Sequence, residues 1–269
     1  MVLRIGSGAL HLRVSPVAPA NEAVDWTAAT AAVPVPMQSA SRVHQANKLL
    51  NALPRQEQKH MIAGMEQVAL HYGEVLYEPG ERIEFIYFPN DSVVSLLTLV
   101  DRHQALEVGL VGREGMVGIP LALETRISPV RALVQGSGTA MRMKAAPVLK
   151  ELRQSPALRR ALHRYTYGLM TQITQTAACN RFHDIEARLA RWLLMTHDRV
   201  QSSEFRLTQD FLAQMLGVRR VGVTRAARTL QQGELIRYSR GTITILDRQG
   251  LEATCCSCYE VVRDMHDAA

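Results

Sequence analysis

The sequence contains no run of about eighteen apolar residues, which is the length that a membrane-spanning helix needs. Its opening stretch also has no unbroken apolar core of the kind found in secretory signal peptides. The motifs of several enzyme classes are missing as well: there is no P-loop, nucleophile elbow, HExxH or glycine-rich dinucleotide turn. We therefore expect a cytoplasmic protein that is not an enzyme.

Cysteine is scarce and unevenly placed, since the four cysteines are Cys179, Cys255, Cys256 and Cys258. Three of them lie close together near the C-terminal end, which fits reduced thiols better than a disulfide framework. The C-C-x-C spacing would hold a metal ion only with ligands from elsewhere in the chain. Reduced thiols on a helix are the simpler interpretation, so we predict no metal site.

Positive charge is plentiful and concentrated in one part of the chain. The 269 residues carry a net charge of +6, which favours an anionic partner such as nucleic acid, although a protein of a membrane surface would give the same total. Residues 201–250 contain no lysine, but eight arginines against four acidic residues give them a net charge of +4. Most of the excess charge therefore lies in this segment.

The composition and the hydrophobic periodicity change along the first half of the chain. Residues 1–40 are rich in Ala, Val and Pro and are predicted to be a flexible extension. Apolar residues then recur at helical spacing up to Val68, which predicts two short helices over residues 42–72. Short β-branched or aromatic runs separated by turn residues follow, which predicts an antiparallel β-roll. Together with the two helices it is assigned to one effector or sensor domain over residues 41–147.

A long helical segment follows the predicted roll. Residues 148–181 keep a period of 3.6, and two competing heptad registers run along them, so we predict a dimerisation helix. A helix of this length could instead pack only on its own roll. The predicted dimer seam consists of Leu162, Tyr165, Leu169, Ile173 and Thr176.

A helix-turn-helix is predicted from Thr208 to Gln231. Thr208 can cap a first helix whose apolar side contains Leu212, Met215 and Leu216. Gly217 permits a tight turn with positive φ, and a second helix is predicted from Val218 to Leu230. The segment from Leu235 to Leu246 reads as two strands around Ser239, Arg240 and Gly241, which is the pattern of a wing.

The outward side of the second predicted helix is basic, as suits the major groove of DNA. The predicted base-reading residues are Arg220, Val221 and Arg225. The predicted DNA backbone contacts are Thr208, Arg219, Thr224, Arg228, Arg237, Tyr238 and Arg240. A solvated helix face and a purely structural hairpin would show the same residues.

Taken in order, these segments resemble the Crp/Fnr family of regulators over residues 42–260. The resemblance rests on GEVLYEPGE at the start of the roll, the long helix, LAQMLGVRRVGVTRAARTLQ and the wing LIRYSRGTITILD. It implies an α+β fold in which a cyclic-nucleotide-binding-like β-roll and a long dimerisation helix precede a winged helix-turn-helix domain at residues 182–269. It also implies a homodimer that binds double-stranded DNA at a two-fold operator and acts on RNA polymerase. A metabolite-sensing or protein-interaction module that does not bind DNA is the alternative.

The sequence also departs from the family pattern. Val221 stands where Crp has a glutamate, which implies a different half-site. Gly115–Pro120 and Ser128-Pro129 do not match the residues that hold the ribose and phosphate of a cyclic nucleotide, so ordinary cyclic-nucleotide binding is not expected. No cysteine precedes Cys179, which argues against the N-terminal iron-sulfur cluster of Fnr-like members. His71 and His103 are available to a haem but are more simply surface or packing residues. We predict no cofactor, and an effector remains unidentified.

Overall fold

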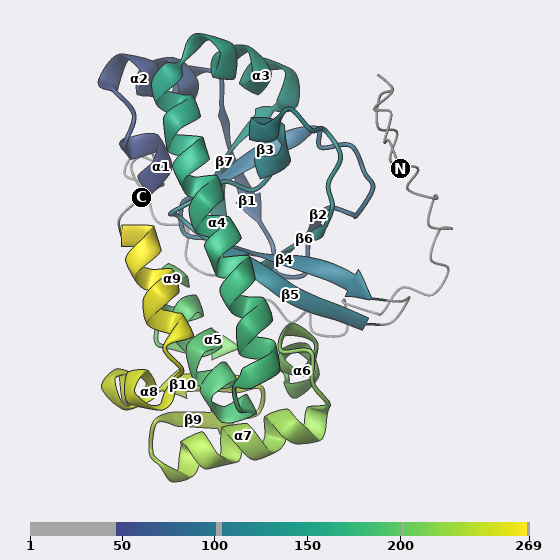
Figure 1. Ribbon diagram of the computed structural model, residues 1–269, viewed down its shortest axis with the longest axis vertical. Coiled ribbons are helices and arrows are strands. Elements are labelled where there is room, and N and C mark those ends of the chain that lie inside the picture. Colours follow the sequence, from purple (N-terminus) through teal and green to yellow (C-terminus); the bar gives the residue numbers. More distant parts are fainter. Residues whose placement is uncertain (1–46, 101–103, 201, 268–269) are drawn as a thin grey trace, which may run out of the picture.

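A computed structural model describes residues 47–100, 104–200 and 202–267 of the protein (Figure 1). The predicted extension over residues 1–40 and the candidate haem ligand His103 lie outside these ranges. Within them, no helix is both long and apolar enough to cross a membrane.

Antiparallel strands form the roll. They are β1 (Glu66–Leu70), β2 (Val75–Tyr77), β3 (Phe85–Pro89), β4 (Val93–Val100), β5 (Gln104–Val111), β6 (Arg131–Gly136) and β7 (Gly138–Lys144). They make two sheets with the strand orders β1-β7-β3 and β2-β6-β4-β5. Side chains from both sheets, among them Phe88 and Val134, meet in one buried apolar cluster. The predicted roll and the α+β fold class are confirmed.

In the described part of the chain before the roll, from residue 47 on, there are two short helices, α1 (Lys48–Asn51) and α2 (Arg55–Ala63). The prediction of helix as far as Val68 is wrong, because β1 already begins at Glu66 and pairs with β7, with Val68 opposite Ala140. Periodicity did not reveal this change because Met65 and Val68 continue the apolar spacing of α2.

Three helices follow the roll, α3 (Ala145–Gln154), α4 (Pro156–Phe182) and α5 (Ile185–Val200). The Ser155 hydroxyl accepts a hydrogen bond from the amide of Leu158, and Pro156 occupies the first turn, so α4 starts with a well-defined cap. Helix α4 runs beside the roll from α3 down to the C-terminal elements (Figure 1). It ends at His183, where the chain leaves the helical conformation and turns into α5.

The burial of α4 requires a correction to the predicted dimer seam. Leu162, Tyr165, Leu169 and Thr176 are buried within the chain, and the first three belong to the core of the roll. The apolar residues that recur at helical spacing in this segment are therefore the ones with which α4 packs on its own roll. Of the predicted seam residues only Ile173, 37% exposed, remains available to a second chain.

The C-terminal part contains four helices and three strands. They are β8 (Glu204–Arg206), α6 (Gln209–Met215), α7 (Arg220–Gln232), β9 (Ile236–Ser239), β10 (Thr242–Ile245), α8 (Arg248–Thr254) and α9 (Cys258–Asp267). The strands form a separate sheet in the order β8-β10-β9. After α8 the chain turns back, so that α9 lies beside the lower half of α4 (Figure 1).

The roll and the C-terminal elements share a second apolar cluster. Val93 and Leu133 of the roll belong to it together with Leu193 of α5 and Leu212 of α6. The two parts are therefore packed together through common buried side chains. The division of the chain into domains at residues 147 and 181 stays a prediction.

A buried polar network crosses the same boundary. The carboxylate of Glu107 in β5 accepts a hydrogen bond from the indole nitrogen of Trp192 in α5, 2.9 Å away. The Ser95 hydroxyl lies 2.7 Å from the other carboxylate oxygen. Burial raises the pKa of Glu107 to about 7, while these two hydrogen bonds act in the opposite direction. Glu107 therefore joins the roll to α5 through a group that titrates near neutral pH.

Candidate nucleic-acid interface

Helix α6 and the turn after it are fixed by local contacts. Thr208 caps α6, since its hydroxyl oxygen accepts a hydrogen bond from the Phe211 amide at 3.1 Å. Helix α6 ends at Met215, and Gly217 adopts a φ of 60° in the turn. The Val218 amide donates to the Ala213 carbonyl, 2.9 Å away, and this bond closes the turn.

Helix α7 presents the predicted base-reading residues on its outward side. Its inward side buries Val223, Ala226, Ala227 and Leu230. Val221 is 72% exposed, and the Arg220 and Arg225 side chains are 64% and 80% exposed. The helix begins at Arg220 rather than Val218, so the two arginines and Val221 lie within its first turns.

Gln209 is a functional candidate that the sequence analysis missed. Its amide oxygen accepts hydrogen bonds from the Thr224 hydroxyl at 2.8 Å and from Nε of Arg220 at 3.4 Å. Gln209 therefore connects the start of α6 to the exposed side of α7. Its position directly after the Thr208 cap was the available signal, because the first residues of both helices meet in this motif.

Arg188 is a second residue that the sequence analysis missed. This α5 residue is buried, and its guanidinium donates hydrogen bonds to the Leu216 carbonyl and, at 2.8 Å, to Oδ1 of Asn180. Cationic side chains at the end of a helix stabilise its free carbonyls. Arg188 therefore attaches the turn after α6 to the junction between α4 and α5.

The wing is present with a third strand. Ser239 pairs with Thr242, which leaves Arg240 and Gly241 as a two-residue turn with φ values of 50° and 77°. Strand β8 pairs with β10 and was not predicted, because three residues are too few for a detectable alternation. Ile243 and Ile245 of β10 are both buried.

Tyr238 of the wing differs from its predicted role. Its hydroxyl donates a hydrogen bond to the Leu207 carbonyl at 2.8 Å, and burial raises its pKa to about 12. The single hydroxyl proton is thus engaged within the protein and does not point to a phosphate. Tyr238 is better described as a residue that attaches the wing to the chain before α6.

The other predicted backbone contacts lie on the surface. The predicted backbone contacts that are exposed are Thr208, Arg219, Thr224, Arg228, Arg237 and Arg240. Opposite charges are few but present, since Arg220 lies 3.5 Å from Asp210 and Arg225 lies 3.9 Å from Glu186. These exposed pairs are weak and leave the guanidinium groups free to reorient toward a stronger anionic partner.

Two segments of the roll bear on the expectation for a cyclic nucleotide. A Cβ atom at Gly115 would overlap the ring of Tyr165, so α4 packs directly on this segment. The Ser128 side chain is buried and donates to the Val130 carbonyl, and Arg131 pairs with Glu78 at 2.8 Å. The polar groups near the two departing segments are thus engaged in internal contacts.

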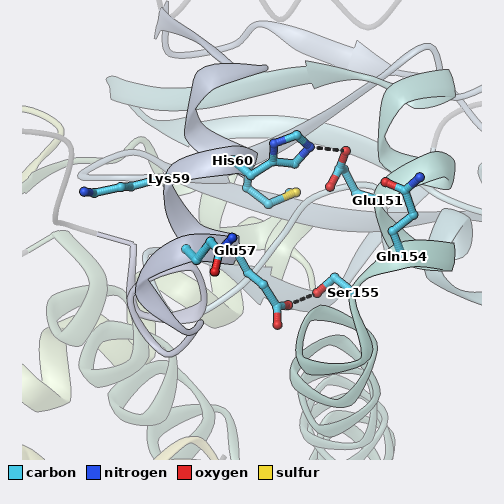
Figure 2. A pocket seen from close by; sticks show the side chains of 8 residues that line it. Glu57, Lys59, His60, Glu151, Gln154 and Ser155 are labelled. Atoms are coloured by element: carbon cyan, nitrogen blue, oxygen red, sulfur yellow. Dashed lines mark hydrogen bonds and ion pairs between the residues drawn. The ribbon is translucent and has the colours of Figure 1, made fainter.

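An open hollow of about 470 Å³ lies at the far end of the molecule, between α2 and the last turn of α3 (Figure 2). Its lining includes His60, which lies 3.1 Å from Glu151, and Glu57, which accepts a hydrogen bond from Ser155. Four polar side chains of the hollow are therefore engaged in pairs with one another.

The geometry defines the class of the C-terminal part, which is a winged helix-turn-helix with a basic outward face. Residues 187–254 match the family model of the Crp-like helix-turn-helix domain. No curated protein matches the chain by sequence. The structural resemblance to Crp/Fnr regulators that the sequence indicated is confirmed, since the chain carries this domain behind the β-roll and long helix of that fold.

Solved structures of similar fold cover most of the chain. FixK2 from Bradyrhizobium japonicum has a TM-score of 0.61 at 15% identity, over 71% of this chain and 98% of its own. The c-di-GMP-responsive global regulator CLP of Xanthomonas campestris has a TM-score of 0.60 at 17% identity, over 72% of this chain and 100% of its own. TTHB099, a CRP-family transcriptional regulator from Thermus thermophilus, has a TM-score of 0.58 at 18% identity, over 71% and 96% of the two chains. At these identities the likeness concerns the fold.

Proposed function

We propose that the protein is a sequence-specific transcription regulator that binds double-stranded DNA as a homodimer and acts on RNA polymerase. The observation that carries the proposal is the exposed first part of α7, where Arg220, Val221 and Arg225 project from a helix whose other side is buried. A helix of this kind fits the major groove, and its N-terminal residues reach the base edges.

Each of the three residues offers a particular chemistry to the bases. A guanidinium donates two parallel hydrogen bonds to the O6 and N7 acceptors of guanine, a role open to Arg220 and Arg225. Val221 offers only apolar contact, such as contact with a thymine methyl group. Arg237 is exposed on the edge strand β9 of the wing and Arg240 in the turn at its tip, where they suit adjacent phosphates.

The proposed dimer uses the outward side of α4. Exposed residues recur there at alternating intervals of four and three, which is the heptad spacing of a helical pair. They are His163, Tyr167, Met170, Thr174, Ala177 and Arg181. Tyr167 and Met170 are 63% and 61% exposed, a large apolar area for a surface helix. Two chains joined here by a two-fold axis would present two α7 helices to half-sites about one helical turn of DNA apart.

Selection of bound sequences from a random DNA pool, followed by gel shifts at fixed moderate salt, tests the proposal. We expect a two-fold consensus, and we expect Arg220→Ala with Arg225→Ala to lose selective binding. The control is Arg153→Ala with Arg160→Ala, which removes the same charge from exposed positions on α3 and α4. Both doubles lower the net charge by the same amount, and only the α7 double should lose the consensus. Recovery of no selected sequence by the wild type would overturn the proposal in favour of a module that does not bind DNA.

A further inference from the structure

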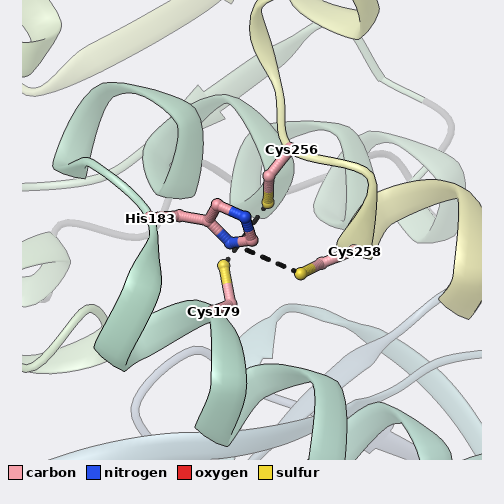
Figure 3. Close-up of side chains that lie close together, drawn as sticks. All are labelled: Cys179, His183, Cys256 and Cys258. Atoms are coloured by element: carbon pink, nitrogen blue, oxygen red, sulfur yellow. Dashed lines mark hydrogen bonds between the residues drawn. The ribbon is translucent and has the colours of Figure 1, made fainter.

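Four side chains with metal-ligating atoms come together where α4 ends (Figure 3). Cys179 and His183 are one helical turn apart at the end of α4, whereas Cys256 lies in the link between α8 and α9 and Cys258 is the first residue of α9. Their ligand atoms all lie within 4.8 Å of one another. The three cysteines are buried and form no disulfide.

The distances fit one tetrahedral ion. With zinc bond lengths of about 2.3 Å to sulfur and 2.0 Å to nitrogen, two ligand atoms of a tetrahedron are separated by roughly 3.5 to 3.8 Å. Sγ of Cys179 lies 3.5 Å from Sγ of Cys256. Sγ of Cys258 lies 3.5 Å from Nδ1 of His183. Both pairs therefore lie within a few tenths of an ångström of ligand spacing.

We propose that Cys179, His183, Cys256 and Cys258 bind one zinc ion in a closed, structural Cys₃His site. Thiolate and imidazole ligands in a tetrahedral arrangement select zinc over magnesium or calcium, which prefer oxygen ligands. On binding, the three thiols release three protons, and neutral His183 donates the lone pair of Nδ1. The expectation of no metal is thereby replaced for these four residues.

Two buried arginines beside the cluster support this assignment. Arg191 and Arg188 are 4% and 7% exposed, and among the described residues neither forms an ion pair with a carboxylate. The Nε atoms of both lack a hydrogen-bond partner. The charge of Arg191 acts on the thiols of Cys179 and Cys258. Three thiolates, one neutral imidazole and Zn²⁺ carry a net charge of −1, which supplies the counter-charge that a buried guanidinium requires.

The proposed ion would connect the end of α4 with the link after α8 and with the start of α9. His183 is also the last cap of α4, because its amide donates to the Cys179 carbonyl at 3.1 Å. The ion would hold α9 against the junction of α4 and α5, from which Arg188 contacts the turn of the helix-turn-helix. Helix α9 lies beyond the residues that match the Crp-like domain, so this connection is an addition to that domain.

Metal content tests the proposal in the full-length protein, purified under reducing conditions. Elemental analysis should find about one zinc per chain, the stoichiometry of a single closed site. Cys256→Ser and Cys258→Ser should each lose at least nine-tenths of that zinc. Cys255→Ser is the matched control, because the Cys255 thiol is directed to the Glu252 carbonyl and lies outside the cluster. The control should retain the full zinc content.

Cobalt substitution of the wild type covers the case in which the variants fail to fold. Replacing zinc with Co²⁺ should give the intense visible bands of tetrahedral cobalt and the near-ultraviolet absorption of thiolate ligands, both absent from Cys256→Ser. Wild type without zinc and without these bands after addition of Co²⁺ would overturn the proposal. Alkylation followed by mass spectrometry detects a disulfide. If the zinc-free wild type contained a Cys179–Cys256 disulfide, the cluster would have a redox role, and the zinc proposal would equally be overturned. DNA binding enters none of these measurements, so they are independent of the proposed function.

Discussion

Glu107 is a single buried carboxyl that should make the stability of the whole protein depend on pH. Its pKa is raised to about 7 in the folded protein from an ordinary value of 4.5. Between these two values the folded state holds a proton that the unfolded state has lost, so stability falls as pH rises through this window and is level above it. Since a tenfold change in proton affinity corresponds to about 1.4 kcal/mol, the fall is on the order of 3 kcal/mol.

We expect Glu107→Gln to remove this decline. Glutamine can accept from Trp192 and donate to Ser95, so the two hydrogen bonds are retained without a charge. Urea denaturation between pH 4.5 and 8 measures the effect, with the exposed Glu204→Gln as the control. A parallel decline in wild type and Glu107→Gln would show that the titrating group lies elsewhere.

Val221 is the residue at which the proposed DNA reading differs from the Crp pattern. The side chain is 72% exposed between Arg220 and Arg225 and has no polar atom. Val221→Glu would introduce an acceptor for the amino group of cytosine, which should add a cytosine preference at one position of each half-site, worth about 1 to 3 kcal/mol.

Sequence selection with Val221→Glu protein checks this expectation. Thr229→Glu is the control, because it places the same charge on the exposed C-terminal half of α7. If both variants selected the wild-type consensus, Val221 would lie outside contact with the bases.

At the scale of elements, Gly217 connects the helix-turn-helix to the roll. Its φ of 60° is unfavourable for other residues, and a Cβ atom there would lie 2.7 Å from Cδ1 of Leu106 in β5. We expect Gly217→Ala to lower the free energy of unfolding by about 1 to 3 kcal/mol. Thermal or urea denaturation gives the value.

Two further variants separate the causes of that loss. Gly233→Ala should change little, because Gly233 has a φ of −79° and its nearest neighbour would be 3.5 Å away. Adding Leu106→Ala to Gly217→Ala should remove the steric part and leave the backbone part. An equal loss in Gly233→Ala would mean that the turn imposes no special constraint.

Elements with a long period were predictable from the sequence, and those defined by distant partners were not. Helices α4 and α7 were predicted because each buries an apolar stripe over three or more turns. Strands β1 and β8 were missed because their pairing with β7 and β10 decides their conformation. The apolar spacing of α4 was recognised, but spacing alone does not tell a roll from a second chain as the partner.

The candidate sites divide in the same way. The exposed arginines of α7 follow from one local period, so their surface position was predictable. Gln209 and Arg188 act across a turn or between helices, and their contacts depend on packing. The cysteine cluster needed ligands more than seventy residues apart, such as Cys179 and Cys256, to be brought together by the return of α9.

In the molecule as a whole, the roll and the helix-turn-helix part are packed together as one continuous body. They share an apolar cluster and the Glu107–Trp192 hydrogen bond. A buried ion pair adds to them, since Nε of Arg199 in α5 lies 2.7 Å from Oε1 of Glu114. The roll is therefore packed directly on α5, and α5 holds the turn of the helix-turn-helix through Arg188.

We expect the protein to dimerise through α4. Substitutions at two neighbouring residues separate an effect on dimerisation from an effect on the stability of the single chain. Met170 is 61% exposed in the proposed seam, whereas Leu169 is 4% exposed and packs on the roll. Met170→Glu should shift the protein from dimer toward monomer in light scattering and weaken operator binding at least tenfold, with the unfolding midpoint of the monomer unchanged. Leu169→Ala should instead lower stability, by about 2 to 5 kcal/mol for a buried leucine.

The control for Met170→Glu is Leu123→Glu, which places the same charge at an apolar residue of similar exposure on the roll, 56%. This control should remain dimeric, because α4 and not general surface hydrophobicity makes the proposed contact. If Met170→Glu stayed dimeric, the seam would have to lie off this side of α4. If the wild type were monomeric at micromolar concentration and still selected a two-fold consensus, dimerisation would occur only on DNA. Met170→Glu should then lose binding to the full site and keep its affinity for a single half-site.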